Sequence, residues 1–350
     1  MKLFNILFTL FGVVTVIFFL FQILPGDPAR MMMDQNENVE QLEIIKKKYG
    51  FDEPVLKQYL YYLNDLSVIS IHFKNPEKIN FIKENKYSFT KIYDFQNSTL
   101  VLKFPYLRES YQRRGVKVST IIMDTFPNTV VLAISSILFA TVFGLLLGIL
   151  SAIYKETLFD NSIQLFSTFG MSMPSFLSSI IFAWIFGFVL ADITGLNMTG
   201  SLFELDDFGD EYRLELKNLI LPSIVLGIRP IAVISMMMRN SLIETLKKNY
   251  VITAYAKGLS KSKVILNHCL KNSLNPVITA LSGWFASLLA GSVFVEYIFG
   301  WNGLGREIVN SLNLLDVPVI IGAVIVVSFS FIMINIFVDY IYKFLDPRIS

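Results

Sequence analysis

The sequence has very little cysteine and histidine, which excludes most disulfide and metal chemistry. Cys269 is the only cysteine in 350 residues, so the chain has neither a disulfide framework nor a cysteine-based metal site. The two histidines, His72 and His268, are far apart in the sequence and form no metal-binding motif. We therefore expect this chain to bind no metal and no cofactor.

The sequence also lacks the common motifs of enzymes and of nucleotide-binding proteins. It has no G-x-x-x-x-G-K-[ST] loop, no H-E-x-x-H pair and no G-x-S-x-G turn. The glycine-rich stretch FGWNGLGR at 299–306 differs from G-x-G-x-x-G, so we assign no nucleotide site to it. We expect a protein that is not an enzyme and that does not bind nucleic acid.

Charge is scarce as well, and this indicates a protein of the lipid bilayer. Charged residues make up 17% of the chain, against about a quarter in soluble proteins. Hydrophobic residues make up 53%, and the mean hydropathy is +0.55. Windows of about 20 apolar residues can cross about 30 Å of hydrocarbon, and such windows lie near 4–24, 128–153, 163–190, 218–238, 275–295 and 318–342. The sequence predicts an all-α membrane protein with six transmembrane helices.

The windows divide the chain into three parts. The first window has no small-x-small cleavage site after it, so residues 1–30 are predicted to be an uncleaved first transmembrane helix. Residues 31–117 form a polar insert, and residues 118–350 form a five-helix core. In the insert, apolar residues at helical spacing predict two short helices joined at Gly50, and the remainder is expected to be irregular. The spaced residues are Val39, Leu42 and Ile45 before Gly50, and Leu56, Tyr59, Leu60 and Leu63 after it.

The distribution of lysine and arginine predicts the orientation in the membrane. Residues 239–273 are strongly basic, and Glu244 is their only acid, whereas residues 191–217 are mostly acidic. Because loops with an excess of lysine and arginine stay in the cytoplasm, we place 239–273 inside and 191–217 outside. Both termini are then cytoplasmic, and the insert is extracytoplasmic.

The fourth window contains a charge and several helix-breaking residues. Arg229 lies near its middle, and Pro222 and Pro230 interrupt the helix. An arginine at a helix centre costs about 2.5–3.5 kcal/mol on membrane insertion, so Arg229 faces protein or water. It either lines a path and meets a carboxylate or carbonyl of the cargo, or forms a buried pair that fixes helix geometry. Pro174 interrupts the third window, where a broken helix lines a cavity or the proline simply makes a kink.

Rows of small residues predict close helix packing. The second window has such a row at Ser136, Ala140, Gly144, Gly148 and Ala152. The fifth window has two rows side by side, Ser282, Ala286 and Ala290 in one and Gly283, Ser287 and Gly291 in the other. In the fifth window, the small residues either pack inside one subunit or line a path or a subunit seam, so Gly283 and Ser287 are candidate pathway residues.

The basic segment 239–273 reads as a helix, a glycine and a second helix. The first helix is predicted over 242–257 as an extension of the fourth span, and Gly258 is predicted to end it in the left-handed conformation. Ser260 is a candidate cap for a second helix that ends near Ser273. One face of the first helix is apolar at its edges and small at its centre, and it consists of Tyr250, Val251, Ala254, Tyr255 and Gly258. Such a face either enters a groove of another protein or lies on lipid headgroups.

The stretch NYVITAYAKGLSKSKVILNHCLKNSLNPVIT resembles the coupling loop of ABC-importer permeases of the dipeptide/oligopeptide (peptide/nickel) type. Other stretches resemble the same family in the same order along nearly the whole chain. They are LPGDPA at 24–29, YGFDEPVLKQYLYYL at 49–63, SMPSF at 172–176, LPSIVLGIRP at 221–230, VEYIFGWNGLGR at 295–306 and LDPRI at 345–349.

This resemblance implies a type I ABC-importer permease that forms half of a pathway for peptides or similar small solutes in the bacterial plasma (inner) membrane. Its partners would be a second homologous permease, two ATP-binding subunits that hydrolyse the ATP, and an extracytoplasmic solute-binding protein. The coupling helix would contact an ATP-binding subunit through Thr253, Ala254, Tyr255, Lys257, Gly258 and Leu259. The alternative is an ion-coupled carrier or channel that acts without an ATPase.

Overall fold

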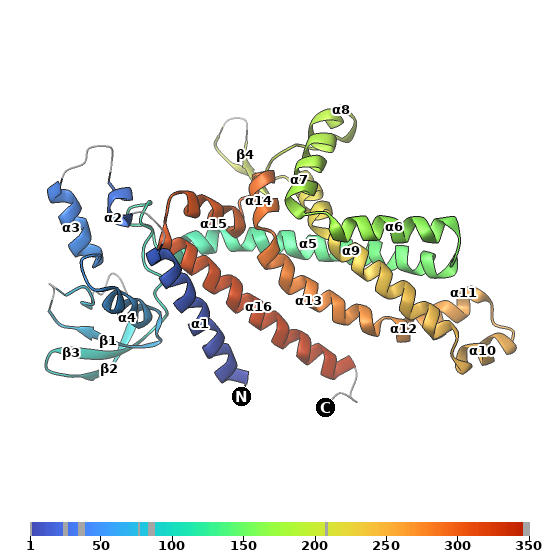
Figure 1. Cartoon of the computed structure of the whole chain (residues 1–350), viewed down its shortest axis with the longest axis horizontal. Coiled ribbons are helices and arrows are strands. Elements are labelled where there is room, and N and C mark those ends of the chain that lie inside the picture. Colours follow the sequence, from blue (N-terminus) through green and yellow to red (C-terminus); the bar gives the residue numbers. More distant parts are fainter. Residues whose placement is uncertain are drawn as a thin grey trace. The chain divides into compact units, whose positions relative to one another are not determined.

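The computed structural model describes residues 2–23, 27–33, 39–75, 78–82, 88–206 and 209–345 (Figure 1). The chain divides into two compact units. One consists of Met1–Asp124 and Ile308–Ser328, and we call it the insert unit. The other consists of Thr125–Glu307 and Phe329–Ser350, and we call it the core unit.

Among the described residues, four helices are long and apolar enough to cross a membrane unaided. They are α1 (Lys2–Ile23), α5 (Val118–Ile153), α9 (Lys217–Leu246) and α16 (Val317–Leu345). Two bent pairs qualify if each counts as one span, namely Leu158–Ser172 with Ser175–Val189, bent by 110°, and Lys261–Ser273 with Asn275–Gly291, bent by 50°. With both pairs counted, the described part of the chain contains the six predicted spans.

The insert unit contains short helices on both sides of Gly50. They are α2 (Pro28–Met31), α3 (Val39–Tyr49) and α4 (Val55–Leu66). Gly50 has φ +74°, a left-handed conformation that glycine adopts without strain. An added Cβ there would also lie 2.7 Å from Ile79 Cδ1, so the turn has no room for a side chain.

Several of the apolar residues expected on one face of α3 and α4 are exposed, and α3 has no buried residue. Val39 is 72% exposed, and Leu56 and Leu60 are 64% and 55% exposed. The residues of α4 that are buried are Tyr59, Tyr62 and Asp65. Asp65 can be buried because Arg108 Nε donates to its carboxylate at 2.8 Å. This ion pair helps to determine which face of α4 is buried.

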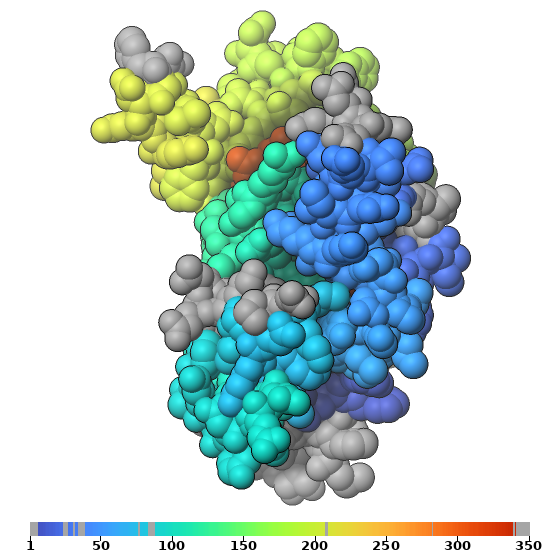
Figure 2. Space-filling model, turned by 90° about the vertical axis from the view of Figure 1, so that its left-hand side faces the viewer, coloured from blue at the N-terminus to red at the C-terminus, as the bar shows by residue number. Residues whose placement is uncertain are grey.

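The insert unit also contains a sheet, so the expectation that the remainder of the insert is irregular was wrong. Its strands are β1 (Ile69–Phe73), β2 (Phe89–Asp94) and β3 (Ser98–Lys103), antiparallel in the order β1-β3-β2. In β1, Ser70 and His72 are buried, whereas Ile69 and Ile71 are 57% and 49% exposed. The strands form part of the surface in cyan (Figure 2). Because the polar side chains face inward, the usual apolar-inward alternation does not identify this sheet.

In the core unit, the predicted row of small residues on α5 packs against α9. All five of its residues are buried. An added Cβ at Gly144 would lie 2.8 Å from Ile234, and one at Gly148 would lie 2.6 Å from the backbone oxygen of Ser235. The two helix backbones approach this closely because glycine has no side chain, as expected for packing without a hydrophobic driving force.

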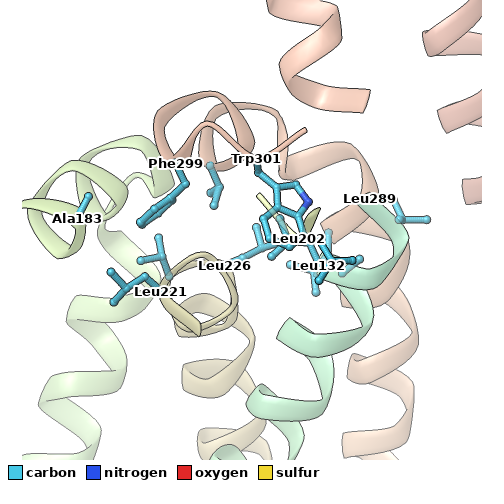
Figure 3. Close-up of a cluster of buried hydrophobic side chains, with 12 residues drawn as sticks. Leu132, Ala183, Leu202, Leu221, Leu226, Leu289, Phe299 and Trp301 are labelled. Carbon is cyan, nitrogen blue, oxygen red and sulfur yellow. The ribbon is translucent and has the colours of Figure 1, made fainter. Parts of the chain in front are cut away.

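A cluster of apolar side chains closes one end of the core unit (Figure 3). Trp301 and Phe299 are its largest members, with exposures of 0% and 1%. Phe299 is the last residue of α14 (Val293–Phe299), and Trp301 lies between α14 and α15 (Leu304–Asn313). Leu132 of α5 and Leu226 of α9 pack in the same cluster. Trp301 Nε1 donates to the backbone oxygen of Asn128 at 3.0 Å, which satisfies its one polar group.

The remaining elements connect the spans of the core unit. The first bent pair consists of α6 (Leu158–Ser172), α7 (Ser175–Trp184) and the π-helical segment η1 (Ile185–Val189). It is followed by α8 (Ala191–Thr194) and by the antiparallel hairpin of β4 (Phe203–Leu205) and β5 (Tyr212–Leu214). The second bent pair consists of α11 (Lys261–Val264), η2 (Ile265–Cys269), α12 (Leu270–Ser273) and α13 (Asn275–Gly291).

Candidate functional site

The basic segment after α9 forms a separate short helix, α10 (Asn249–Ala256), rather than an extension of α9. The predicted continuous helix over 242–257 was wrong, because α9 ends at Leu246 and a turn at Lys247 and Lys248 follows. Lys248 has ψ 145°, which is extended and breaks the helical path. The axis of α10 is therefore set by its own contacts.

Gly258 ends α10 in a Schellman motif, as the sequence predicts. Its φ is +81°. Its N–H donates to the oxygen of Tyr255 at 2.9 Å, and the N–H of Leu259 donates to the oxygen of Ala254 at 3.4 Å. These two bonds satisfy the last carbonyls of the helix. An added Cβ at Gly258 would meet no atom within 4 Å, so the space beside it is open.

One side of α10 is buried and the other is open. Val251 and Ala254 are 0% and 6% exposed and pack in a cluster with Met238 and Leu242 of α9. The predicted contact face was therefore wrong in its centre, because Ala254 points into this chain. Tyr250 and Tyr255 are each 40% exposed, and Ile252 is 58% exposed.

Of the other residues predicted for this contact, Thr253, Lys257 and Gly258 are exposed and Leu259 is partly buried. α11, η2 and α12 carry the chain back from Gly258, and Asn272 Nδ2 donates to Tyr250 Oη at 2.9 Å. The backbone of Ser260 occupies the cap position of α11, but its hydroxyl makes no capping bond.

A buried ion pair that sequence reasoning missed lies at the same end of the core unit. Arg239 of α9 binds Asp160 of α6 through two bonds, Nε to Oδ1 at 2.7 Å and Nη2 to Oδ2 at 2.6 Å. Asp160 is fully buried, and it also accepts from Ser151 Oγ at 2.5 Å and from the N–H of Glu156 at 2.9 Å. One carboxylate thus joins the ends of α5, α6 and α9. The signal in the sequence was a single acid in the apolar stretch LFDNSIQLF.

At the other end of the core unit, the glycine-rich loop encloses a second buried carboxylate. Glu296 is 0% exposed and accepts from Ser292 Oγ at 2.8 Å and from the N–H of Gly305 at 2.6 Å. Burial raises the pKa of this carboxyl, and the hydrogen bonds oppose that shift. An added Cβ at Gly303 would overlap the Glu296 carboxylate. The glycines at 303 and 305 leave space for Glu296.

A small cavity of about 60 Å³ in the core unit brings together two of the candidate pathway residues. Arg229 of α9 and Ser287 of α13 both line it. Trp284, which the sequence analysis did not single out, lies beside them, and Ser175 and Ser178 contribute from α7. Arg229 is exposed, and its guanidinium has no hydrogen bond or ion pair with any residue that the structure describes.

The other candidate pathway residues lie outside the cavity lining. Pro174 is the N-cap of α7, at the 110° bend, and its neighbours Met173 and Ser175 line the cavity. Pro222 is buried in α9. Gly283 is exposed on α13, where an added Cβ would meet no atom within 4 Å.

Two family models match the chain. The model described as "Binding-protein-dependent transport system inner membrane component" matches residues 144–350. A second model, for the N-terminal part of such membrane components, matches residues 1–85.

Curated relatives match nearly the whole chain. The di/tripeptide transport system permease protein of Pseudomonas aeruginosa is 32% identical over 358 residues, which cover 97% of this chain and 95% of that protein. The glutathione transport system permease protein of Escherichia coli strain K12 is 30% identical over 348 residues, covering 99% and 97%. The dipeptide transport system permease protein of Alkalihalophilus pseudofirmus is 30% identical over 354 residues, covering 97% and 95%.

Among solved structures, a chain of the MetNI methionine ABC transporter in an inward-facing conformation has a similar fold. The TM-score is 0.53 at 15% identity, and the match covers 65% of this chain and 97% of that chain. This likeness shows a fold of the ABC-importer permease kind.

Proposed function

Because the chain belongs to the family of binding-protein-dependent transport system inner membrane components, we propose that it carries peptides or similar small solutes across the bacterial inner membrane as half of an importer's pathway. The chain is a multi-pass permease subunit of an ABC importer. Relatives named for di/tripeptide, dipeptide and glutathione transport support a peptide cargo.

The proposed assembly contains a second homologous permease, two ATP-binding subunits and an extracytoplasmic solute-binding protein. ATP is hydrolysed on the ATP-binding subunits, and this chain carries no cofactor. The basic charge of 239–273 supports a cytoplasmic position for α10 and for both termini. The acidic segment 191–217 then faces the solute-binding protein's side of the membrane.

The observation that carries the coupling proposal is that one side of α10 is buried in this chain and the other side is exposed. Its inner side is held by Val251 and Ala254, so the helix is fixed to the ends of α9 and α5. Its outer side leaves Tyr250, Ile252 and Tyr255 for a partner. A displacement of α10 by an ATP-binding subunit is then transmitted to α9 through packed side chains, and it changes which side of the membrane the cavity faces.

A cross-linking experiment tests this proposal. Cys269 is buried, and its replacement by alanine gives a background without cysteine. In the assembled complex, a photoreactive probe on Thr253→Cys is expected to capture an ATP-binding subunit. The same probe on Arg213→Cys in β5 serves as the control, because Arg213 is also exposed but lies in the acidic segment.

Capture of an ATP-binding subunit from position 253, and not from position 213, is the expected result. A membrane-impermeant maleimide is expected to reach position 213 from outside intact cells and position 253 only after the membrane is opened. Labelling of position 253 in intact cells would overturn the orientation, and capture from neither position would overturn the coupling role of α10. Solute uptake without any ATP-binding subunit would indicate a carrier instead.

A further inference from the structure

Arg229 differs from Arg239, the other arginine of α9, in having no partner among the residues that the structure describes. Arg239 holds Asp160 in a two-bond ion pair. Arg229 lies ten residues earlier and has no bond to any described residue. A buried pair within this chain, one of the two interpretations that the sequence left open, is therefore absent from the described structure. The guanidinium is available for an anion from elsewhere.

The helices that form the cavity offer Arg229 no carboxylate. α7 and α13 contain no acidic residue, α6 contains Asp160, which Arg239 binds, and α9 contains Glu244. Glu244 lies fifteen residues from Arg229, about 22 Å along a helix. An acid on the same helices therefore does not neutralise Arg229.

The groups around Arg229 are free hydrogen-bond donors. Trp284 contributes an indole N–H, which can only donate, and Ser287 contributes a hydroxyl. No hydrogen bond to a described residue engages either group. A guanidinium has parallel N–H groups that match the two oxygens of a carboxylate. A cation surrounded by free donors, without a carboxylate, is complementary to an anion.

The size of the cavity limits what can occupy it. Its volume is about 60 Å³, and one water molecule takes about 30 Å³ of liquid. This space accepts an end group such as a carboxylate and excludes a whole peptide. The rest of the ligand must then lie outside the cavity.

We propose that Arg229, Trp284 and Ser287 form a subsite that binds the terminal carboxylate of the cargo during passage. This inference rests on the proposed function, since it takes the cargo to be a peptide with a free C-terminus. A carboxylate of a neighbouring permease subunit has the same chemistry, and the experiment below distinguishes the two sources.

The test compares two cargoes in the complete complex reconstituted in vesicles with its solute-binding protein. Uptake of labelled dialanine is compared with uptake of its C-terminal amide, for the wild type and for Arg229→Gln, Arg229→Lys and Trp284→Phe. The same solute-binding protein is used with every variant, so any preference of that protein for dialanine or for the amide is the same in all of them. Arg213→Gln in the exposed hairpin is the matched control for loss of one positive charge.

Arg229→Gln is expected to lower dialanine uptake about tenfold through a higher KM and to leave uptake of the amide unchanged. Arg229→Lys is expected to retain part of the preference, because it keeps the charge but not the paired donors. Trp284→Phe is expected to lower dialanine uptake less than Arg229→Gln does. Arg213→Gln is expected to match the wild type for both cargoes.

Three results overturn the subsite alone. The first is an equal effect of Arg229→Gln on both cargoes. The second is failure of that variant to assemble with the second permease, which would assign Arg229 to a carboxylate of that subunit. The third is unchanged dialanine uptake by Arg229→Gln, which leaves the proposed function intact. If the wild-type complex transports neither cargo, the proposed peptide function falls, and the subsite falls with it.

Discussion

Gly258 and Gly303 lie in opposite surroundings. Beside Gly258, at the end of α10, an added Cβ would meet no atom within 4 Å, whereas beside Gly303 it would overlap the Glu296 carboxylate. Gly258 has φ +81°, whereas Gly303 is not in the left-handed conformation. The first glycine provides a backbone conformation at an open surface, and the second provides space in a closed interior.

The two ends of the core unit differ in the same way, since one is closed by buried groups and the other has an exposed surface. The end with Glu296 and Trp301 buries its polar groups against its own backbone. The end with α10 buries the Asp160–Arg239 pair but leaves aromatic and aliphatic side chains exposed on the outer side of α10. Tyrosine is enriched among the residues that contribute most to protein–protein binding. Three substitutions test whether the two ends differ in this way.

The largest effect is expected for Asp160→Ala. Removing one partner of a buried ion pair leaves the other charge unpaired, which costs about 3–5 kcal/mol. Because Arg239 keeps 15% of its side chain exposed, we expect the lower part of that range. Thermal unfolding of the purified permease complex measures the loss.

The control for Asp160→Ala is Glu156→Ala. Glu156 pairs with Lys155 at the surface, with 77% of its side chain exposed, and such pairs contribute at most about 1 kcal/mol. Equal unfolding temperatures for the two variants would contradict a stabilising role for the buried Asp160–Arg239 pair.

Gly303→Ala is expected to have the next largest effect. A methyl group forced into this packed site displaces Glu296 or the Thr129 hydroxyl, which lies 2.7 Å from the added Cβ. Such overpacking costs about 1–3 kcal/mol, and it appears as lower accumulation and a lower unfolding temperature. Gly12→Ala in α1 is the control, because an added Cβ there meets no atom within 4 Å. Normal accumulation of Gly303→Ala would show that the packing around Glu296 adjusts to the added methyl group.

The smallest effect on stability, with a separate effect on transport, is expected for Gly258→Val. A left-handed residue with a side chain costs about 1–2 kcal/mol, so the protein is expected to accumulate. ATP-dependent uptake is expected to fall, because the end of α10 changes shape where the partner is proposed to bind. Gly258→Asn tolerates the left-handed conformation and is expected to retain more uptake than Gly258→Val. Normal uptake by Gly258→Val would exclude a coupling role for this position.

Local signals predicted much of the core unit from sequence. The row from Ser136 to Ala152 was visible because small residues recur at every fourth position, and the structure packs it against α9. Gly258 was visible as the end of a helix because an apolar, helix-forming stretch precedes it and a serine follows. In both places the backbone itself requires the residue type.

Features that depend on distant partners were not predictable in the same way. Asp160 and Arg239 are 79 residues apart, and neither has a sequence neighbour that reveals the other. Val251 and Ala254 were assigned to a partner's groove, but they are covered by the chain's own α9. In β1 the buried residues are Ser70 and His72, so the pattern of apolar residues pointed away from the interior of the sheet.

The glycines of α5 have a mechanical consequence for the whole core unit. Gly144 and Gly148 add no side chain of their own to the contact between α5 and α9, so the α5 backbone lies directly against Ile234, Ser235 and Met238 of α9. Because α5 and α9 are in such close contact, we expect the two helices to move together as a rigid body. A displacement at one end of α5 and α9 is then expected to reach their other end with little internal rearrangement.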